Sequence, residues 1–168
     1  MLRGRTVTLR PATAGDVPTL AAIRATPEVR RWWRGGDDLA ADVRADLADE
    51  TLSVYAVEHD GRVVGAIQWH AEEDPDYRHA SMDIFLDPAV RGAGLGGDAI
   101  RTLARHLIDE HGHHRFTIDP AAANTAAIRA YAKIGFRPVG LLRRYERGED
   151  GRWHDGLLMD LLAEDLAD

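Results

Sequence analysis

The sequence predicts an α/β protein in which a mixed sheet carries helices on its faces. Three observations lead to this prediction. Short β-rich runs alternate with amphipathic stretches along the chain. Asp60-Gly61 joins two of these runs as a tight hairpin, and the Gly-rich segment 91–97 precedes a helix pattern with one apolar stripe. At 168 residues the chain has the ordinary size of one domain, so we expect a single domain over residues 1–168.

The N-terminal part of the chain is expected to form a strand and two helices. Residues 7–10 alternate between apolar and polar side chains in the manner of a strand. Thr13 and Asp16 have the spacing of a capping box, which predicts a helix through Ala25. A second helix, with Asp37 or Asp38 as its cap, is predicted by apolar residues at helical spacing: Leu39, Val43 and Leu47.

The central part is expected to form a hairpin, another strand and a long helix. The β-rich runs 52–58 and 62–70 flank the turn at Asp60-Gly61, and a further strand is predicted at residues 80–86. The Gly-rich segment then opens a helix that ends near residues 111–112. Its apolar stripe consists of Ile100, Leu103, Ala104, Leu107 and Ile108.

The C-terminal part is expected to form a strand, a helix and a long hairpin. Residues 116–118 have the pattern of a short buried strand, and the next helix is capped by Asn124 and closed by Gly135. The runs 137–147 and 152–162 flank a Gly-containing turn and predict an antiparallel hairpin. The sheet is therefore expected to be predominantly antiparallel, with about four helices around it.

The composition excludes several classes of function. The chain has no cysteine, which excludes disulfides, thiolate metal sites and a cysteine nucleophile. No stretch approaches the roughly 20 apolar residues of a membrane span, and the N-terminus lacks an apolar signal core, so we expect a cytoplasmic protein without a membrane partner. The formal charge of −7 argues against a nucleic-acid partner and suits either simple solubility or a small cationic partner.

The segment from Arg91 to Gly96 is the first that suggests chemistry. It lies between a strand and a helix, where glycines let backbone amides approach a phosphate and the helix N-terminus adds partial positive charge. It lacks the Lys-Ser/Thr pair of a P-loop and the Gly-x-Gly-x-x-Gly pattern of a dinucleotide site. On these residues alone, an anion cradle and an ordinary Gly-rich helix start both remain open.

A second block makes the pattern specific. The spacing Arg91-x-x-Gly94-x-Gly96 resembles the pyrophosphate-binding signature of the GNAT superfamily of acetyltransferases. The next motif of that superfamily resembles Asn124-x-x-Ala127-Ile128-x-x-Tyr131-x-Lys133-x-Gly135-Phe136. The two motifs occur in the expected order, and the resemblance covers nearly the whole chain. It implies a GNAT-like sheet whose middle strands splay apart to admit the cofactor arm.

The resemblance implies acetyl-coenzyme A as the co-substrate. Its pyrophosphate is expected on the backbone amides of Arg91, Gly92, Ala93, Gly94, Leu95 and Gly96. Ile84 and Leu86 would lie along the pantetheine arm, with the Leu86 backbone near the thioester, where an amide can stabilise the oxyanion of the transition state. The remaining cofactor contacts would come from Asn124, Ala127, Tyr131 and Lys133. Asn124 is explained equally well as a helix N-cap.

Tyr131 is expected to act as a general acid. It follows Asn124 by two helical turns and therefore lies on the same face of the helix. The family uses a tyrosine at this place to protonate the departing thiolate. A phenol of pKa about 10 gives a proton to the thiolate of a thiol of pKa about 8.5 only when the site helps. The alternative is a core aromatic that only packs.

Asp83 is the leading candidate for a catalytic base. A primary amine of pKa near 10 must lose a proton before it attacks a thioester, and a nearby carboxylate assists that step. Asp83 stands in mid-strand between Met82 and Ile84, where a carboxylate is unusual unless it is paired or functional. The alternative is an outward-facing strand residue, since alternation places Asp83 on the face opposite its neighbours.

Within the superfamily, the sequence most resembles the aminoglycoside 6'-N-acetyltransferases. The similar blocks are Trp32-Trp33 with Gly35-Gly36, residues 65–68, and residues 117–120 with Asn124. In those enzymes, acidic residues that match Asp83 and Asp119 meet the ammonium groups of the drug. Asp119 also suits an ordinary turn, and the two tryptophans suit a core edge as well as a wall over the substrate.

We therefore expect direct acetyl transfer to a primary amine of an aminoglycoside, most readily the 6'-amino group, with antibiotic resistance as the result. One alternative is acetylation of a protein N-terminus or a siderophore precursor, and another is a non-enzymatic module that senses acyl-coenzyme A. No metal is expected, because His111, His113 and His114 lack residues at suitable spacing to complete a zinc site. A monomer and a homodimer suit the sequence equally well.

Overall fold

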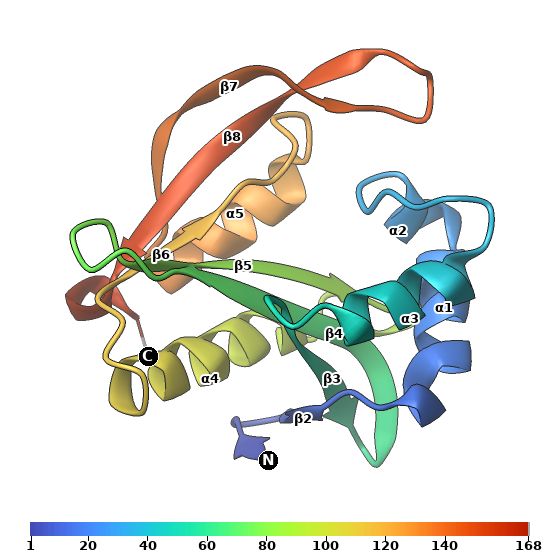
Figure 1. Cartoon of the computed structure of the whole chain (residues 1–168), viewed down its shortest axis with the longest axis horizontal. Coiled ribbons are helices and arrows are strands. Elements are labelled where there is room, and N and C mark those ends of the chain that lie inside the picture. Colours follow the sequence, from blue (N-terminus) through green and yellow to red (C-terminus); the bar gives the residue numbers. More distant parts are fainter. Residues whose placement is uncertain (168) are drawn as a thin grey trace.

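The computed structural model of the protein describes residues 1–167 and contains one sheet of eight strands (Figure 1). Their order in space is β1-β2-β3-β4-β5-β6-β8-β7. All neighbours are antiparallel except β5 and β6, which are parallel. The strands are β1 (Leu2–Arg3), β2 (Thr8–Pro11), β3 (Ser53–His59), β4 (Arg62–Glu72), β5 (His79–Leu86), β6 (Arg115–Ile118), β7 (Arg137–Arg147) and β8 (Trp153–Leu162).

The α-helices lie on the two faces of this sheet. One face packs against α4 and α5, and the other packs against α1, α2 and α3 (Figure 1). The helices are α1 (Val17–Arg24), α2 (Pro27–Arg30), α3 (Leu39–Ala48), α4 (Leu95–Asp109) and α5 (Thr125–Ile134). The predicted mixed, predominantly antiparallel sheet with helices on its faces is confirmed.

Alternation along β5 separates two hydrophobic cores. Ala80 and Met82 belong to the core that contains α4, whereas Phe85 belongs to the core formed with α1, α2 and α3. Because successive side chains of a strand point to opposite faces, Asp83 faces the same side as Phe85. This alternation directs the carboxylate away from the α4 core.

The predicted turn at Asp60-Gly61 is confirmed. His59 pairs with Arg62, and the two residues between them have left-handed backbone angles, with φ of 49° at Asp60 and 74° at Gly61. A two-residue hairpin of this kind requires positive φ at both positions, which asparagine, aspartate and glycine tolerate best. The local sequence therefore sets the pairing of β3 with β4 next to the turn, before the register shifts between Val57 and Glu58.

The N-terminal region differs in detail from the prediction. The helix expected from Thr13 starts with a 3-10 turn over Ala14–Asp16 and continues as α1. The short elements β1 and α2 were not predicted. A two-residue strand and a four-residue helix are too short to produce a periodic pattern, so no signal for them was available.

Strands β5 and β6 part after a short contact, as the resemblance implied. They pair only at Ala80 with Phe116 and at Ser81 with Thr117, although β5 continues to Leu86. Beyond Ile118 the chain stays beside β8, because the Pro120 carbonyl accepts the Leu157 N–H at 2.8 Å and the Ala122 N–H donates to the Asp155 carbonyl at 2.9 Å. One edge of β5 is left open.

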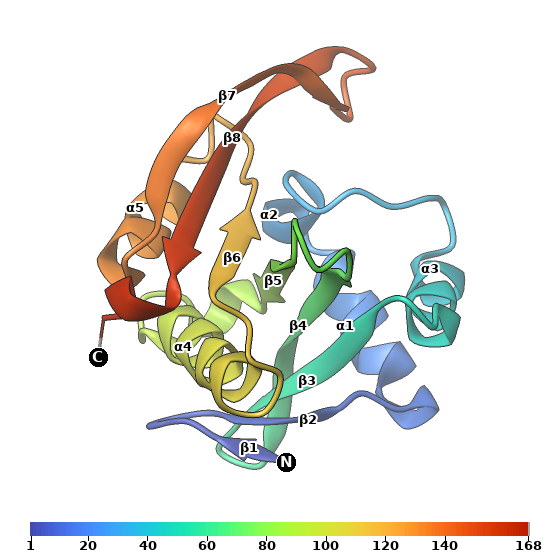
Figure 2. The ribbon, with the colours of Figure 1, turned by 60° about the vertical axis from the view of Figure 1, so that its left-hand side comes forward.

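The β7–β8 hairpin is the outermost part of the sheet. It curves over the other strands, and its tip reaches α2, where Glu149 pairs with Arg30 at 3.4 Å (Figures 1 and 2). Strand β7 is exposed along nearly all of its length, whereas β8 buries Gly156, Met159 and Leu161. The pairing of the two strands is irregular between Leu142 and Glu146. The hairpin therefore has one face toward the rest of the fold and one free edge.

Within residues 1–167, none of the helices has the length and apolar character that crossing a bilayer requires. The longest, α4, has fifteen residues, and its polar residues other than the buried Asp98 lie outside the core.

The capping network at the start of α1 leads to a first prediction. The Asp16 carboxylate accepts the Thr13 N–H at 2.7 Å and is paired with the Arg10 guanidinium at 2.8 Å. The hydrogen bond from Arg10, supported by those from Thr13 and opposed by burial, lowers the pKa of Asp16 from 3.8 to about 2. The folded state therefore gains stability above about pH 4, and this gain is lost as the pH falls toward about 2.

We expect Asp16→Asn to lower the free energy of unfolding by about 2 kcal/mol at neutral pH. The difference from wild type should shrink below about pH 4 and vanish near pH 2. Urea unfolding at a series of pH values measures this, with exposed Asp37→Asn as the control. A difference that does not depend on pH would show that the carboxylate charge is not the cause.

Candidate active site

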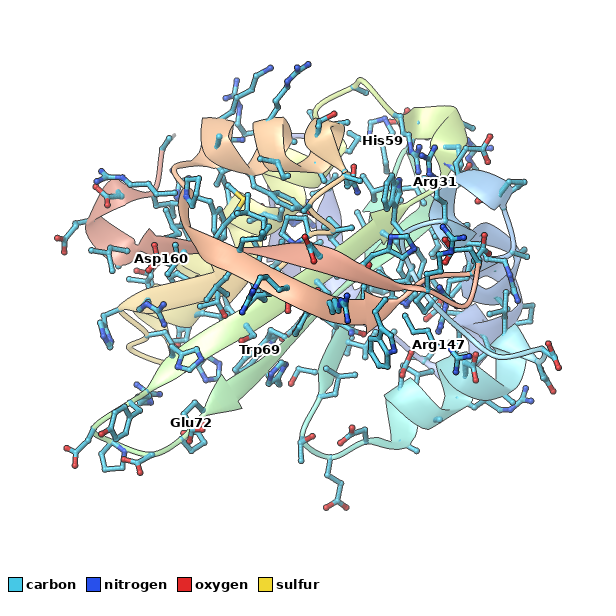
Figure 3. All side chains as sticks on the ribbon, turned by 90° about the horizontal axis from the view of Figure 1, so that it is seen from above. Arg31, His59, Trp69, Glu72, Arg147 and Asp160 are labelled. Atoms are coloured by element: carbon cyan, nitrogen blue, oxygen red, sulfur yellow. The ribbon has the colours of Figure 1, made fainter. Side chains whose placement is uncertain are left out.

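A cavity of about 1050 Å³ lies between the sheet and the β7–β8 hairpin. Seen from above, the hairpin crosses over β4 and β5, with Asp160 and Arg147 toward its opposite ends (Figure 3). The floor comes from β4, β5 and β6, and one wall comes from Arg24, Trp33 and Arg34. The polar residues of the floor and hairpin are Gln68, His70, His79, Ser81, Asp83, Arg115, Thr117, Asp119, Tyr145 and Glu146.

Asp83 lies on the floor of this cavity. It is half-buried and stands opposite Gln68 in the pairing of β4 with β5. Burial raises the pKa of Asp83 to about 7, and the negative charges of Asp119 and Glu146 act in the same direction, whereas the Gln68 side chain opposes them. At neutral pH this carboxyl group can therefore both accept and release a proton.

The other charged residues of the cavity are of both signs. Arg24 pairs with Asp46 at 3.1 Å, and Arg115 pairs with Asp160 at 3.2 Å. Burial and the charge of Asp119 raise the pKa of Glu146, and Arg34 opposes the rise. Asp83 and Asp119 line the cavity on β5 and just after β6, the two strands that part here.

Tyr131 reaches this region from the opposite face of the sheet. Its ring packs against Phe136, with 6.1 Å between ring centroids, at the edge of the α4 core. Burial raises the pKa of the Tyr131 phenol well above its ordinary value, and the charges of Asp83 and Asp119 add to the rise. Tyr131 is thus a core aromatic whose hydroxyl group also lies within electrostatic range of both carboxylates.

The Gly-rich segment forms an open loop at the start of α4. Gly92 and Gly94 have φ of 83° and 77°, a left-handed conformation that glycine adopts at little cost. No heavy atom lies within 4 Å of the position that a Cβ would take at either residue. The first amides of a helix have no partner within the helix, so those after Gly94 are available to an anion.

The residues expected along the pantetheine arm lie beside this loop. Leu86 ends β5, and a Cβ placed on Gly96 would contact its side chain at 3.4 Å. Ile84 packs at the edge of the α4 core, on the face opposite Asp83. On the side where β6 has turned away, the β5 backbone has no strand neighbour from Met82 to Leu86 in the described structure.

The start of α5 confirms the capping role of Asn124. Its side-chain oxygen accepts the Ala127 N–H at 3.2 Å, and Gly135 closes the helix with φ of 119°. The Asn124 amide nitrogen is not needed for this cap. Lys133 lies exposed in the last turn of the helix, far along the axis from Asn124, so these two residues do not meet at one point.

The two neighbouring tryptophans take different places. Trp33 packs edge-on against Phe85, with 4.8 Å between ring centroids, and also lines the cavity. Trp32 lies under the Arg31 guanidinium, 4.7 Å from its ring, and lines a second cavity of about 540 Å³ with the hairpin residues Glu146 and Asp150. The pair therefore forms no single wall, because each ring faces a different cavity.

The family is decided by a match over most of the chain. Residues 6–137 match the model of the acetyltransferase (GNAT) domain. The chain belongs to the GNAT acetyltransferase family. Its class of activity is therefore that of an acyl-coenzyme A dependent N-acetyltransferase.

Relatives of this GNAT protein act on different amines. Aminoglycoside N(6')-acetyltransferase type 1 of Klebsiella pneumoniae is 29% identical over 153 residues, which cover 80% of this chain and 75% of the relative. The [ribosomal protein bS18]-alanine N-acetyltransferase of Escherichia coli K12 is 37% identical over 83 residues, 48% of this chain and 53% of the relative.

Solved GNAT structures share the whole fold. A structure of AAC(6')-Ib in complex with paromomycin and acetyl-coenzyme A has a TM-score of 0.78 and 26% identity, and covers 95% of each chain. Mycobacterium smegmatis RimJ in complex with CoA-disulfide has a TM-score of 0.83 and 25% identity, and covers 96% of this chain and 84% of that one.

Several cavity residues of this GNAT chain were not predicted from sequence. Tyr145 and Glu146 lie on β7, a largely exposed strand where polar residues are ordinary. Arg34 lies in the loop after α2, which gave no periodic signal. Only the curvature of the hairpin brings β7 over the floor of the cavity, and no local pattern encodes that contact (Figure 3).

His111 and His113 form an aromatic cluster with Trp69. Trp69 makes edge contacts with His111 and His113, at 5.3 and 5.8 Å between ring centroids. Burial lowers the pKa of His113, which favours the neutral imidazole. In residues 1–167, no three histidine or acidic side chains are placed to hold a metal ion.

The charges around Asp83 lead to a second prediction. Removing a neighbouring negative charge should bring the pKa of Asp83 down from about 7, more in Asp119→Asn than in Glu146→Gln, because the effect of Asp119 is the larger. Replacing Gln68 by leucine should raise the pKa of Asp83, since the Gln68 side chain favours the ionised carboxylate.

Carboxyl ¹³C NMR titration, with Asp83→Asn to assign the signal, measures these pKa values. Asp74→Asn, in the exposed turn after β4, is the control that leaves the pKa of Asp83 unchanged. If the pKa of Asp83 were near the ordinary value of about 4, this would contradict the claim that burial and neighbouring charges raise it.

Proposed function

We propose that this enzyme acetylates a primary amine of aminoglycoside antibiotics, most readily the 6'-amino group. The observation that carries the proposal is the pair of carboxylates, Asp83 and Asp119, placed in one cavity beside the opening between β5 and β6. Carboxylates that line a cavity attract polycationic amines and speed their capture. The relatives of known substrate and the overall charge of −7 agree with it.

Acetyl-coenzyme A is the proposed co-substrate, and the residues present suit it. The open loop at Gly92 and Gly94, with the α4 N-terminus behind it, suits a pyrophosphate group. The Arg91 side chain adds a positive charge, and the unpaired edge of β5 near Leu86 offers backbone groups to an amide-containing arm. The Asn124 amide nitrogen and the first turn of α5 would face the same arm.

Asp83 is the proposed base. It takes a proton from the ammonium group of the bound drug, and the nitrogen lone pair then attacks the acetyl carbonyl carbon. A backbone amide at Leu86 stabilises the negative charge that develops on the carbonyl oxygen. The raised pKa of Asp83 suits this role, because a base with a pKa near the working pH is the most effective.

Tyr131 is the proposed acid. When the carbon–sulfur bond breaks, the phenol donates its proton to the coenzyme A thiolate. The nitrogen releases its second proton to solvent as the amide forms, and the Tyr131 phenolate then takes a proton back from solvent. Its raised pKa keeps the phenol protonated through neutral pH, so a proton is available at each turnover. The transfer is favourable only if the thiolate is also desolvated, because burial raises the basicity of both groups.

Resistance to aminoglycosides in the cytoplasm would follow from this activity, since a neutral amide replaces an ammonium group of the drug. A monomer suffices for the proposed chemistry, because every group in it comes from one chain, and the free edge of β7 would also allow a homodimer. No step in the proposal uses a metal ion.

Acetylation of a protein N-terminus is the second candidate. Arg34 lines the cavity together with the carboxylates and the paired Arg24 and Arg115, and a purely cationic drug does not require an arginine there. A peptide carries one ammonium group and many carbonyl oxygens, which arginine side chains can bind. The N-terminal acetyltransferase relatives support this candidate over about half of the chain.

A substrate panel separates these candidates. We expect release of free thiol from acetyl-coenzyme A with 6'-amino aminoglycosides, and a single added acetyl group by mass spectrometry. Kanamycin should be acetylated far faster than spermine or a peptide that begins with alanine. Turnover only on the peptide would establish the second candidate, and tight cofactor binding without turnover on any amine would indicate a sensing module.

The role of Asp83 predicts the pH profile. The value of kcat/KM should rise with pH around a midpoint near 7, since it reports the free enzyme. The profile of kcat should have a lower midpoint, because bound ammonium groups favour the ionised carboxylate. Asp83→Asn should lower kcat by at least about 100-fold and abolish the rise of the rate with pH. The control Asp76→Asn should change neither kcat nor the pH profile.

Tyr131→Phe should lower kcat by about 10- to 100-fold and leave the KM for acetyl-coenzyme A near its wild-type value. Wild-type kcat in both the Asp83 and Tyr131 variants, between about pH 6 and 9, would contradict the assigned roles.

A further inference from the structure

An irregularity in β7 directs one side chain into the cavity. The pairing of β7 with β8 shifts between Leu142 and Glu146, and Arg144 adopts a left-handed backbone with φ of 49°. This conformation is uncommon for a residue other than glycine and persists only when the surroundings hold it. Here the Asp155 carboxylate accepts the Arg144 N–H at 2.8 Å and fixes the bulge.

The strand opposite the bulge is shaped to receive the Tyr145 ring. Gly156 of β8 is buried, and a Cβ at this position would lie 2.8 Å from Cδ1 of Tyr145. Any larger residue would therefore push the ring away. The bulge at Arg144 and the glycine at position 156 are independent features of two strands, and both place the same phenol.

The Tyr145 hydroxyl group donates a hydrogen bond to Oδ2 of Asp119. This bond is the main cause that raises the pKa of Tyr145 to about 12, with burial and the charges of Asp119, Asp83 and Glu146 adding to it. Both partners line the cavity, and Tyr145 also lines a second cavity of about 800 Å³, which is formed by β7 residues and Asp155. The ring thus stands between two spaces.

We propose that Tyr145 is a substrate-positioning residue, which holds the Asp119 carboxylate so that its Oδ1 faces the ammonium group of the bound amine. This inference rests on the proposed function and extends it to a residue outside the GNAT motifs. The phenol occupies one carboxylate oxygen, so the substrate meets a single oxygen in a fixed direction. The same ring closes the cavity wall and limits the positions that the amine can take.

The test measures binding and turnover in parallel. Kanamycin binding is measured by isothermal titration calorimetry, and acetyl transfer to kanamycin by thiol release. We expect Tyr145→Phe to weaken binding and raise the kanamycin KM by about tenfold, with kcat changed by less than about threefold and the KM for acetyl-coenzyme A unchanged. Tyr77→Phe removes a hydroxyl group from an exposed turn and is the matched control.

A double-mutant cycle decides whether Tyr145 acts through Asp119. If it does, Tyr145→Phe has no further effect on kanamycin binding in an Asp119→Asn background. If the two substitutions weaken kanamycin binding independently, so that their fold-changes multiply, the inference is overturned. Thermal unfolding of all four proteins shows that each is folded, and Tyr145→His, which keeps a donor on the ring, should recover part of the affinity.

The two readouts distinguish this inference from the proposed function. If kanamycin binds without being acetylated, and the cycle shows that Tyr145 and Asp119 are coupled in binding it, the aminoglycoside activity is overturned and the role of Tyr145 is supported. Acetylation of kanamycin without coupling in the cycle would support the activity and overturn the role of Tyr145. Absence of both binding and transfer would overturn both.

Discussion

The parting of β5 and β6 is the constraint on which the site depends. Backbone groups inside a protein must find partners, and after Ile118 the chain finds them on β8 rather than on β5. Strand β5 is left with an open edge as far as Leu86. Groups on opposite faces of the sheet, Asp83 on one and Tyr131 on the other, therefore come close enough to influence each other's charge.

The cavity holds like charges together at a cost. Asp83 lies half-buried near Asp119 and Glu146, and this arrangement favours its neutral form at a pH where an isolated aspartate is fully ionised. The charge comes mainly from Asp119, in the segment after β6, and to a lesser extent from Glu146 on β7. A cationic substrate would relieve the repulsion, so the same feature that disfavours the empty site favours the proposed ligand.

The sequence predicted the parts of the fold that local chemistry determines. The hairpin at Asp60-Gly61, the N-cap at Asn124 and the loop before α4 depend on residues adjacent in the chain. The directions of Trp32 and Trp33 and the approach of the hairpin depend on contacts between distant segments. Asp83 was recognisable because a carboxylate in mid-strand is unusual, whereas polar residues on an exposed strand such as β7 are not.

The exposed β7 strand gives the enzyme a tolerant surface for change. A substitution on this strand alters the roof of the cavity without removing a side chain from either core, since the strand buries little. Mutations on β7 that change which substrate binds would therefore cost little folding stability. The cofactor side, built into the start of α4 and its buried stripe, has no such freedom. Evolution of new acceptors on this scaffold is therefore expected to proceed mainly through the hairpin.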